Sequence, residues 1–219
     1  MKLLARKILL PIGGLLVASF LSAAEHAAPA VGAEAALAKL KEGNARFAGS
    51  QVSAAKPTAA RRAELAQTQH PFAVVVGCAD SRTTPEIVFD QNLGDLFVIR
   101  TAGTLVDHHA LGSIEYAVEH LGTRLVVVLG HERCGAVKAA LASDTAPGHV
   151  HSIVRDLQPA VQAAKGQPGD ASDRTIAENA RLVATRIRRE AKLGDHAKDV
   201  RIVAGVYDLD TGEVAWVRD

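Results

Sequence analysis

The sequence predicts an α/β fold, with a mostly parallel central β-sheet, flanking helices and an N-terminal helical arm. The first observation is a set of short apolar runs without polar alternation, at residues 72–77, 96–99, 124–130 and 200–207. Such runs suit strands that are buried on both faces of a sheet. The second is that helical patterns separate the runs, which is typical of parallel sheets. The third is the length of 219 residues, which is enough for one sizeable core.

The helices follow from the spacing of apolar residues and from capping residues. Leu37, Leu40 and Phe47 fall near one face of a helix over residues 34–47, and this helix is the predicted arm. Asp107 can cap another helix, because its side chain can accept hydrogen bonds from free N–H groups of a first turn. The remaining predicted elements are helices over residues 61–69, 107–120, 134–141 and 173–192 and an edge strand over residues 213–217.

The N-terminus is predicted to be a secretory signal peptide. Three basic residues precede an apolar run over residues 8–21, and small residues follow at Ser22-Ala23-Ala24. The run is shorter than the roughly 20 residues needed to span a bilayer, and an uncleaved membrane anchor is the alternative. We therefore expect residues 1–24 to be cleaved, residues 25–219 to form a single domain, and the protein to be periplasmic, with no membrane contact after cleavage.

The charge balance excludes several classes of partner. The formal net charge is +1, with 48% hydrophobic and 22% charged residues. Removal of residues 1–24 takes away three basic and no acidic residues, so the mature chain carries a formal charge of −2. This composition is globular and lacks the basic excess of a nucleic-acid-binding protein, so no nucleic acid is expected as a partner.

The reactive side chains follow two of the predicted strands. Cys78 comes directly after the first strand, and His131 and Cys134 come directly after the third. If these strands are neighbours, all three side chains converge where ligands bind in such sheets. Two sulfurs and an imidazole suit zinc and leave a fourth position open, as in catalytic zinc sites. A structural disulfide between the only two cysteines is the alternative, because exported proteins tend to have oxidised thiols.

Asp80 and Arg82 lie two and four residues after Cys78. An aspartate beside an arginine is held ionised and can orient a nucleophilic water next to a metal ion. The alternatives are that Asp80 caps the helix leading into Pro85 and that Arg82 is a surface cation. Cys134 would begin a helix, where free N–H groups favour a thiolate. The N–H group of Gly135 could face a bound anion.

Residues 72–141, with the motifs C-A-D-S-R and G-H-E-R-C-G, closely resemble the β-class carbonic anhydrases, and the similarity extends over most of the mature chain. The resemblance implies zinc-dependent, reversible hydration of carbon dioxide to bicarbonate and a proton. It implies one Zn²⁺ per chain and a homodimer in which the N-terminal helix of each chain embraces the other chain. Two such dimers could pair to form a homotetramer. The residue roles that it implies are zinc ligation by Cys78, His131 and Cys134, a catalytic dyad of Asp80 and Arg82, and substrate binding by Gln69, Phe97 and Gly135.

Three other functions are compatible with the same residues. The first is hydrolysis of carbon disulfide or carbonyl sulfide on the same fold and ligand set. The second is a metal-free Cys–His hydrolase with a thiolate nucleophile. The third is a non-catalytic exported binding protein that a Cys78–Cys134 disulfide stabilises.

Overall fold

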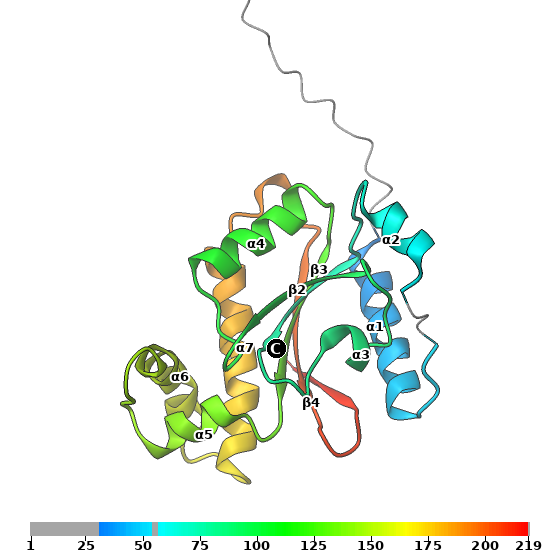
Figure 1. Ribbon diagram of the computed structural model, residues 1–219. Helices are drawn as coiled ribbons and strands as arrows, with labels where there is room; N and C mark the ends of the chain where they lie inside the picture. Colours follow the sequence, from blue (N-terminus) through cyan, green and yellow to red (C-terminus); the bar gives the residue numbers. More distant parts are fainter. Residues whose placement is uncertain (1–30, 54–56, 219) are drawn as a thin grey trace, which may run out of the picture.

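A computed structural model describes residues 31–53 and 57–218, and these form a five-stranded sheet with the strand order β2-β1-β3-β4-β5 (Figure 1). The first four strands are parallel, and β5 pairs antiparallel with β4. The strand bounds are β1 Ala73–Cys78, β2 Leu96–Thr101, β3 Leu125–His131, β4 Arg201–Tyr207 and β5 Val214–Val217. The mostly parallel sheet and the antiparallel edge strand confirm the predicted architecture.

Helices cover both faces of this sheet (Figure 1). Their bounds are α1 Ala33–Ala48, α2 Ala59–Leu65, α3 Pro85–Val88, α4 His108–Glu119, α5 Gly135–Ala142, α6 Val150–Ala164 and α7 Ala171–Glu190, with a short 3-10 helix at Gly194–His196. Asp107 accepts a hydrogen bond from the Ala110 N–H and caps α4, as predicted. No helix of the described ranges is both long and apolar enough to cross a membrane.

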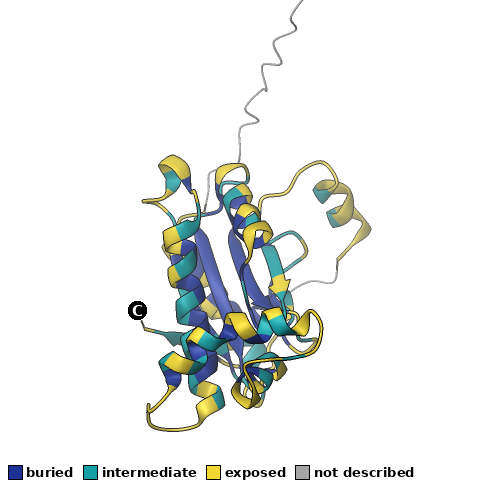
Figure 2. Ribbon diagram, turned by 90° about the vertical axis from the view of Figure 1, so that its left-hand side faces the viewer, coloured by how far each residue is buried: buried dark blue, intermediate teal, exposed yellow. Residues whose placement is uncertain are grey.

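The two central strands are buried on both faces, which explains their unbroken apolar sequences. Alternate residues of a strand point to opposite faces. Val74 and Val126 therefore pack with α4 and α7, whereas Val75 and Val127 pack on the side of α1 and α3. The dark core in Figure 2 lies between these helical layers. The core holds the ends of β1 and β3 in fixed positions, which matters for the residues that follow them.

The predicted N-terminal helical arm is α1, and it packs against the sheet of its own chain. Leu37 and Leu40 are buried in the same cluster as the inner residues of β1 and β3. Asn44 makes three buried hydrogen bonds: its amide group donates to the carbonyls of Val88 and Gly212, and its oxygen accepts from the Val214 N–H. These contacts join α1 to both α3 and β5.

The sequence did not predict α6, and the bounds of two other helices differ from the prediction. Pro159 lies inside α6, where proline usually interrupts a helix, but Val154 and Leu157 are buried on one face. The helix predicted over residues 61–69 is α2; it begins at Ala59, because the Thr58 side chain caps it, and it ends at Leu65, earlier than predicted. The helix predicted over residues 173–192 is α7 and begins at Ala171, because Asp170 accepts hydrogen bonds from its first turn.

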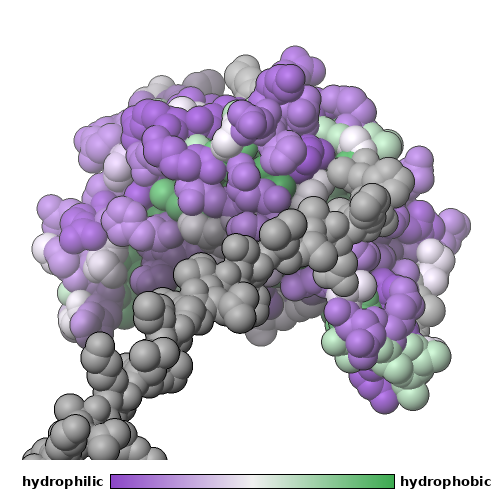
Figure 3. Space-filling model, turned by 90° about the horizontal axis from the view of Figure 1, so that it is seen from above, coloured by the Kyte–Doolittle hydropathy of each residue, from purple (hydrophilic) through white to green (hydrophobic). Residues whose placement is uncertain are grey.

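The predicted signal peptide lies outside the described residues, so the fold does not bear on it. The surface seen from above the molecule is predominantly hydrophilic (Figure 3). Helix α2 has no buried residues and stands away from the body of the domain (Figure 2).

Candidate metal centre

Two adjacent parallel strands end side by side in potential metal ligands. β1 ends at Cys78 and β3 ends at His131, so both residues are the last of their strands. Cys134 follows as the N-cap residue of α5. The two Sγ atoms and a ring nitrogen of His131 all lie within 4.8 Å of one another. The structure thus brings together the three residues that the sequence predicted as ligands.

The imidazole of His131 has one nitrogen free for a metal ion. Its Nδ1 donates a hydrogen bond to the Glu132 carbonyl at 2.8 Å, since a carbonyl can only accept. Nε2 then carries the lone pair; it is buried, and within the described part of the chain it has no hydrogen-bond partner. Leaving a buried polar atom unsatisfied costs about 1–3 kcal/mol. A cation that binds this lone pair removes the cost, so the site fits a metal ion.

Both cysteines are free and buried, so the structure does not support the disulfide alternative. The neighbouring Cys134 thiol lowers the pKa of Cys78 well below its usual range. The same interaction raises the pKa of Cys134, because its proton is shared with the Cys78 sulfur. A divalent cation that displaces this proton gains two soft thiolate ligands.

The chain is exposed to solvent directly after Cys134. Gly135, the first residue of α5, is exposed, and a Cβ atom built on it would meet no other atom within 4 Å. Two sulfurs and one imidazole supply three ligands, whereas catalytic zinc takes three protein ligands and one exchangeable one. The open space beside Gly135 leaves room for a small molecule near the cluster.

Asp80 and Arg82 form a two-pronged ion pair beside the cluster. Arg82 Nε donates to Asp80 Oδ1 at 2.9 Å, and Nη2 donates to Oδ2 at 2.7 Å. These hydrogen bonds lower the pKa of Asp80 well below its usual range. Asp80 Oδ2 lies 3.9 Å from Nε2 of His131, which is too far for a hydrogen bond. The carboxylate is nevertheless close to where a metal ion bound by Nε2 would lie.

This geometry decides between the alternatives for the dyad. The N-cap residue of helix α3 is Thr84, and no side chain, that of Asp80 included, caps the helix. The Asp80 carboxylate instead accepts from the backbone N–H and the guanidinium of Arg82. Arg82 is half exposed, but its guanidinium is committed to Asp80 and also donates to the Arg133 carbonyl at 3.4 Å. The pair therefore faces the ligand cluster as a unit.

The sequence did not predict how Arg100 supports this loop. Arg100 Nε donates to the Cys78 carbonyl at 2.8 Å, and Nη2 donates to the Asp80 carbonyl at 2.5 Å. The guanidinium thereby fixes the backbone on both sides of Ala79. The signal that could have found this role is strand register, because β1 and β2 pair Gly77 with Arg100.

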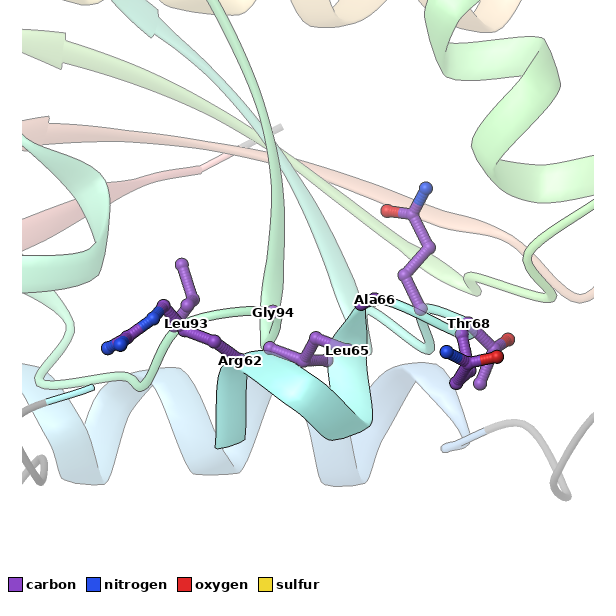
Figure 4. Close-up of a pocket in the computed structure, with 8 residues that line it drawn as sticks. Arg62, Leu65, Ala66, Thr68, Leu93 and Gly94 are labelled. Atoms are coloured by element: carbon purple, nitrogen blue, oxygen red, sulfur yellow. The ribbon is translucent and has the colours of Figure 1, made fainter. Parts of the chain in front are cut away.

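Within one chain, Gln69 and Phe97 do not reach the ligand cluster. Gln69 precedes β1, at the end opposite Cys78, and lines a pocket of about 610 Å³ between α2 and residues 93–94 (Figure 4). Phe97 pairs with Val74, four residues before Cys78, or about 13 Å along the strand at roughly 3.3 Å per residue. Its ring contacts Tyr116 of α4. Of the predicted substrate-binding residues, only Gly135 lies beside the cluster.

Comparison with known proteins identifies what this arrangement is similar to. The family model described as carbonic anhydrase matches residues 73–214. Carbonic anhydrase 2 of Mycobacterium tuberculosis (strain H37Rv) is 42% identical over 195 residues, which cover 84% of this chain and 92% of that protein. A carbonic anhydrase of Mycolicibacterium smegmatis is 51% identical over 131 residues, which cover 58% of this chain and 64% of that protein.

Solved structures show the same fold. A Coccomyxa β-carbonic anhydrase in complex with acetazolamide is 28% identical, with a TM-score of 0.63, and the match covers 71% of this chain and 75% of that one. A tetrameric β-carbonic anhydrase of Sordaria macrospora has a TM-score of 0.66 at 21% identity, covering 72% of this chain and 86% of that one. At that identity the second match shows the fold alone.

The geometry predicts one zinc ion per chain at the ligand cluster. We expect His131→Ala to weaken zinc affinity by at least about 100-fold, because loss of a direct ligand should exceed the 10–100-fold effects of outer partners. Metal analysis and chelator competition on the purified protein measure both quantities. His109→Ala is the matched control, since that side chain is 99% exposed on α4. Equal zinc affinity in the two variants would contradict the assignment.

Proposed function

The chain belongs to the β class of the carbonic anhydrase family, and on that premise we propose that it hydrates carbon dioxide reversibly to bicarbonate and a proton with one zinc ion held by Cys78, His131 and Cys134. The observation that carries the proposal is the buried cluster of three potential ligands next to an ionised aspartate. A purely structural zinc site would have four protein ligands and not three.

The chemistry of the zinc ion is to make water nucleophilic near neutral pH, since a zinc ion can lower the pKa of bound water from about 15.7 to about 7. The residues of the chain supply orientation. Asp80 is held ionised by Arg82 and lies beside the cluster, so its Oδ2 can accept a hydrogen bond from the attacking water. That bond would point a lone pair of the water toward the carbon of carbon dioxide.

Arg82 acts through Asp80. Its two hydrogen bonds fix both carboxylate oxygens, and its contact with the Arg133 carbonyl ties the pair to the loop between His131 and Cys134. Arg100 holds the carbonyls of Cys78 and Asp80 from the neighbouring strand. A carboxylate held in this way needs little reorganisation during the reaction, which favours catalysis.

We propose that a second copy of the chain completes the substrate pocket. Gln69 and Phe97 are implied substrate contacts by the family resemblance, but each lies toward the other end of the sheet from its own cluster. In a homodimer, these side chains could line the partner's site, which would reconcile their implied role in substrate binding with their distance from the cluster of their own chain. Strand β2, which carries Phe97, is at the edge of the sheet, and Leu93 beside the Gln69 pocket is 45% exposed. Two such dimers pairing would give a homotetramer.

Export to the periplasm and cleavage after Ala24 remain part of the proposal. They are supported by the basic, apolar and small-residue segments in that order at the N-terminus. Mass spectrometry of the protein from a periplasmic extract should give a mature chain that begins at Glu25. A chain that keeps residues 1–24 and stays with the membrane fraction would instead favour the anchor.

Asp80→Asn should lower kcat/KM for carbon dioxide hydration by about 100-fold or more, the usual scale for removing a group that handles a proton in the transition state. The amide keeps the shape of the side chain but lacks the charge that Arg82 stabilises. Stopped-flow measurement with a pH indicator gives the rate, and metal analysis should show unchanged zinc.

Asp156→Asn is the matched control, because Asp156 also pairs with an arginine, its neighbour Arg155 on α6. A wild-type rate in Asp80→Asn would contradict the role of the dyad. The same assay with carbon disulfide and carbonyl sulfide tests the alternative substrates. Faster turnover of either compound than of carbon dioxide would favour that alternative.

The shared pocket predicts complementation between two inactive chains. Gln69→Ala keeps its metal ligands, and Cys134→Ser keeps its Gln69, so a mixed dimer would contain one complete site. Refolding the two variants together in equal amounts should restore about a quarter of wild-type activity, because half of randomly formed dimers are mixed and each has one working site. No gain on mixing would mean that Gln69 does not serve the partner's site.

A further inference from the structure

Asn179 is a buried polar side chain on the apolar face of α7. It is only 5% exposed, and its neighbours on that face include Ile176, Ala180 and Val183. Burying an amide in apolar surroundings is unfavourable unless its groups are hydrogen-bonded. An apolar residue here would leave the hydrogen-bond partner of Asn179 unsatisfied, so the identity of that partner indicates what the side chain does.

Two successive hydrogen bonds connect Asn179 to the candidate metal ligands. Asn179 Nδ2 donates to the Gly103 carbonyl at 2.8 Å, and this contact is buried and spans 76 residues of sequence. The N–H of Gly103 in turn donates to Sγ of Cys78 at 3.4 Å, also in a buried environment. Gly103 therefore links the side chain of Asn179 to a sulfur of the ligand cluster.

The loop that carries Gly103 has an unusual backbone conformation. Gly103 has φ +80°, and Thr104 after it has φ +54°, both in the left-handed region. Such a conformation is strained at Thr104 and persists only where the surroundings fix it. A Cβ atom at Gly103 would lie 3.2 Å from Leu157 and 3.3 Å from Ala136, so the backbone is also tightly enclosed. The direction of the Gly103 N–H thus depends on contacts that hold this loop.

Other contacts of the loop hold different points. The Thr104 hydroxyl donates to the Leu129 carbonyl at 3.3 Å, and Arg186 of α7 donates to the Val106 carbonyl at 2.7 Å. The Thr104 N–H also donates to the Thr101 carbonyl at 3.1 Å and closes a turn around Gly103. Asn179 is the side chain that holds the carbonyl of Gly103 itself. Its loss would leave this buried carbonyl without that donor and would remove one restraint on the direction of the Gly103 N–H.

We propose that Asn179 is a positioning residue of the metal centre, which fixes Gly103 so that its N–H donates to the Cys78 sulfur. This inference rests on the proposed zinc site. An N–H donor aimed at a thiolate fixes the orientation of the sulfur and stabilises its charge, and outer partners of this kind commonly change metal affinity by 10–100-fold. Asn179 does not touch the ligands or the substrate, so its effect on the reaction is indirect.

The test is the zinc dissociation constant of Asn179→Ala, measured by competition with a chromophoric chelator. We expect it to rise by about 10-fold relative to wild type. Thr175→Val is the matched control. Thr175 is also a buried polar residue of α7, one turn earlier, but its hydroxyl bonds to Ala171 within the same helix. The control should bind zinc with wild-type affinity even if urea unfolding shows that both variants lose similar stability.

A spectroscopic readout separates positioning from a general loss of stability. In the cobalt-substituted protein, the thiolate-to-cobalt charge-transfer band should shift in Asn179→Ala and stay unchanged in Thr175→Val. An equal loss of zinc affinity in both variants, or identical bands in wild type and Asn179→Ala, would overturn the proposal. A wild-type chain that binds no zinc would overturn the proposed function and this inference together, whereas wild-type affinity in Asn179→Ala would overturn only the role of Asn179.

If Asn179→Ala does not fold, the proposal is tested on the wild-type protein through the hydrogen bond from the Gly103 N–H to the Cys78 sulfur. With cadmium-113 in the site, NMR should detect a coupling between the metal and the Gly103 amide proton through the N–H···S hydrogen bond. That proton and the side-chain amide protons of Asn179 should exchange slowly with solvent. Rapid exchange at Gly103 without any coupling to the metal would overturn the proposal.

Discussion

The proposed chemistry depends on the proximity of two sulfurs and one imidazole at the ends of two adjacent parallel strands. Parallel pairing of β1 and β3 brings Cys78 and His131 to the same edge of the sheet, and the start of α5 adds Cys134. Burial makes this arrangement unfavourable unless the lone pairs bind a proton or a cation. The imidazole already uses Nδ1 for a backbone carbonyl, so Nε2 is left for the cation.

The surrounding structure orients this cluster from several sides. The strands are buried on both faces and cannot easily shift. Arg100 holds the backbone after β1, and Arg82 holds the carboxylate of Asp80. Helix α7 packs closely on β3, since a Cβ at Gly130 would lie 3.1 Å from Ile176. Sites built on such rigid elements keep their geometry without help from the substrate.

The sequence predicted the parts of the site that are local. Cys78, Asp80 and Arg82 lie within five residues, and His131 and Cys134 within four, so their motifs and the apolar runs before them were sufficient. The contact of Asn179 with Gly103 spans 76 residues and depends on how α7 packs, which no local pattern encodes. Helix α6 was missed because Pro159 interrupts the usual helical signal. The resemblance already implied a homodimer; the sheet adds that Gln69 and Phe97 lie away from the cluster of their own chain.

X-ray absorption at the zinc edge of the purified protein tests the central claim most directly. The account predicts a four-coordinate zinc ion with two sulfur neighbours at about 2.3 Å and two nitrogen or oxygen neighbours at about 2.0–2.1 Å, of which one is the imidazole. The same spectrum in Cys134→Ser should show one sulfur fewer. A zinc shell with no sulfur neighbour, or no loss of sulfur in Cys134→Ser, would contradict the account.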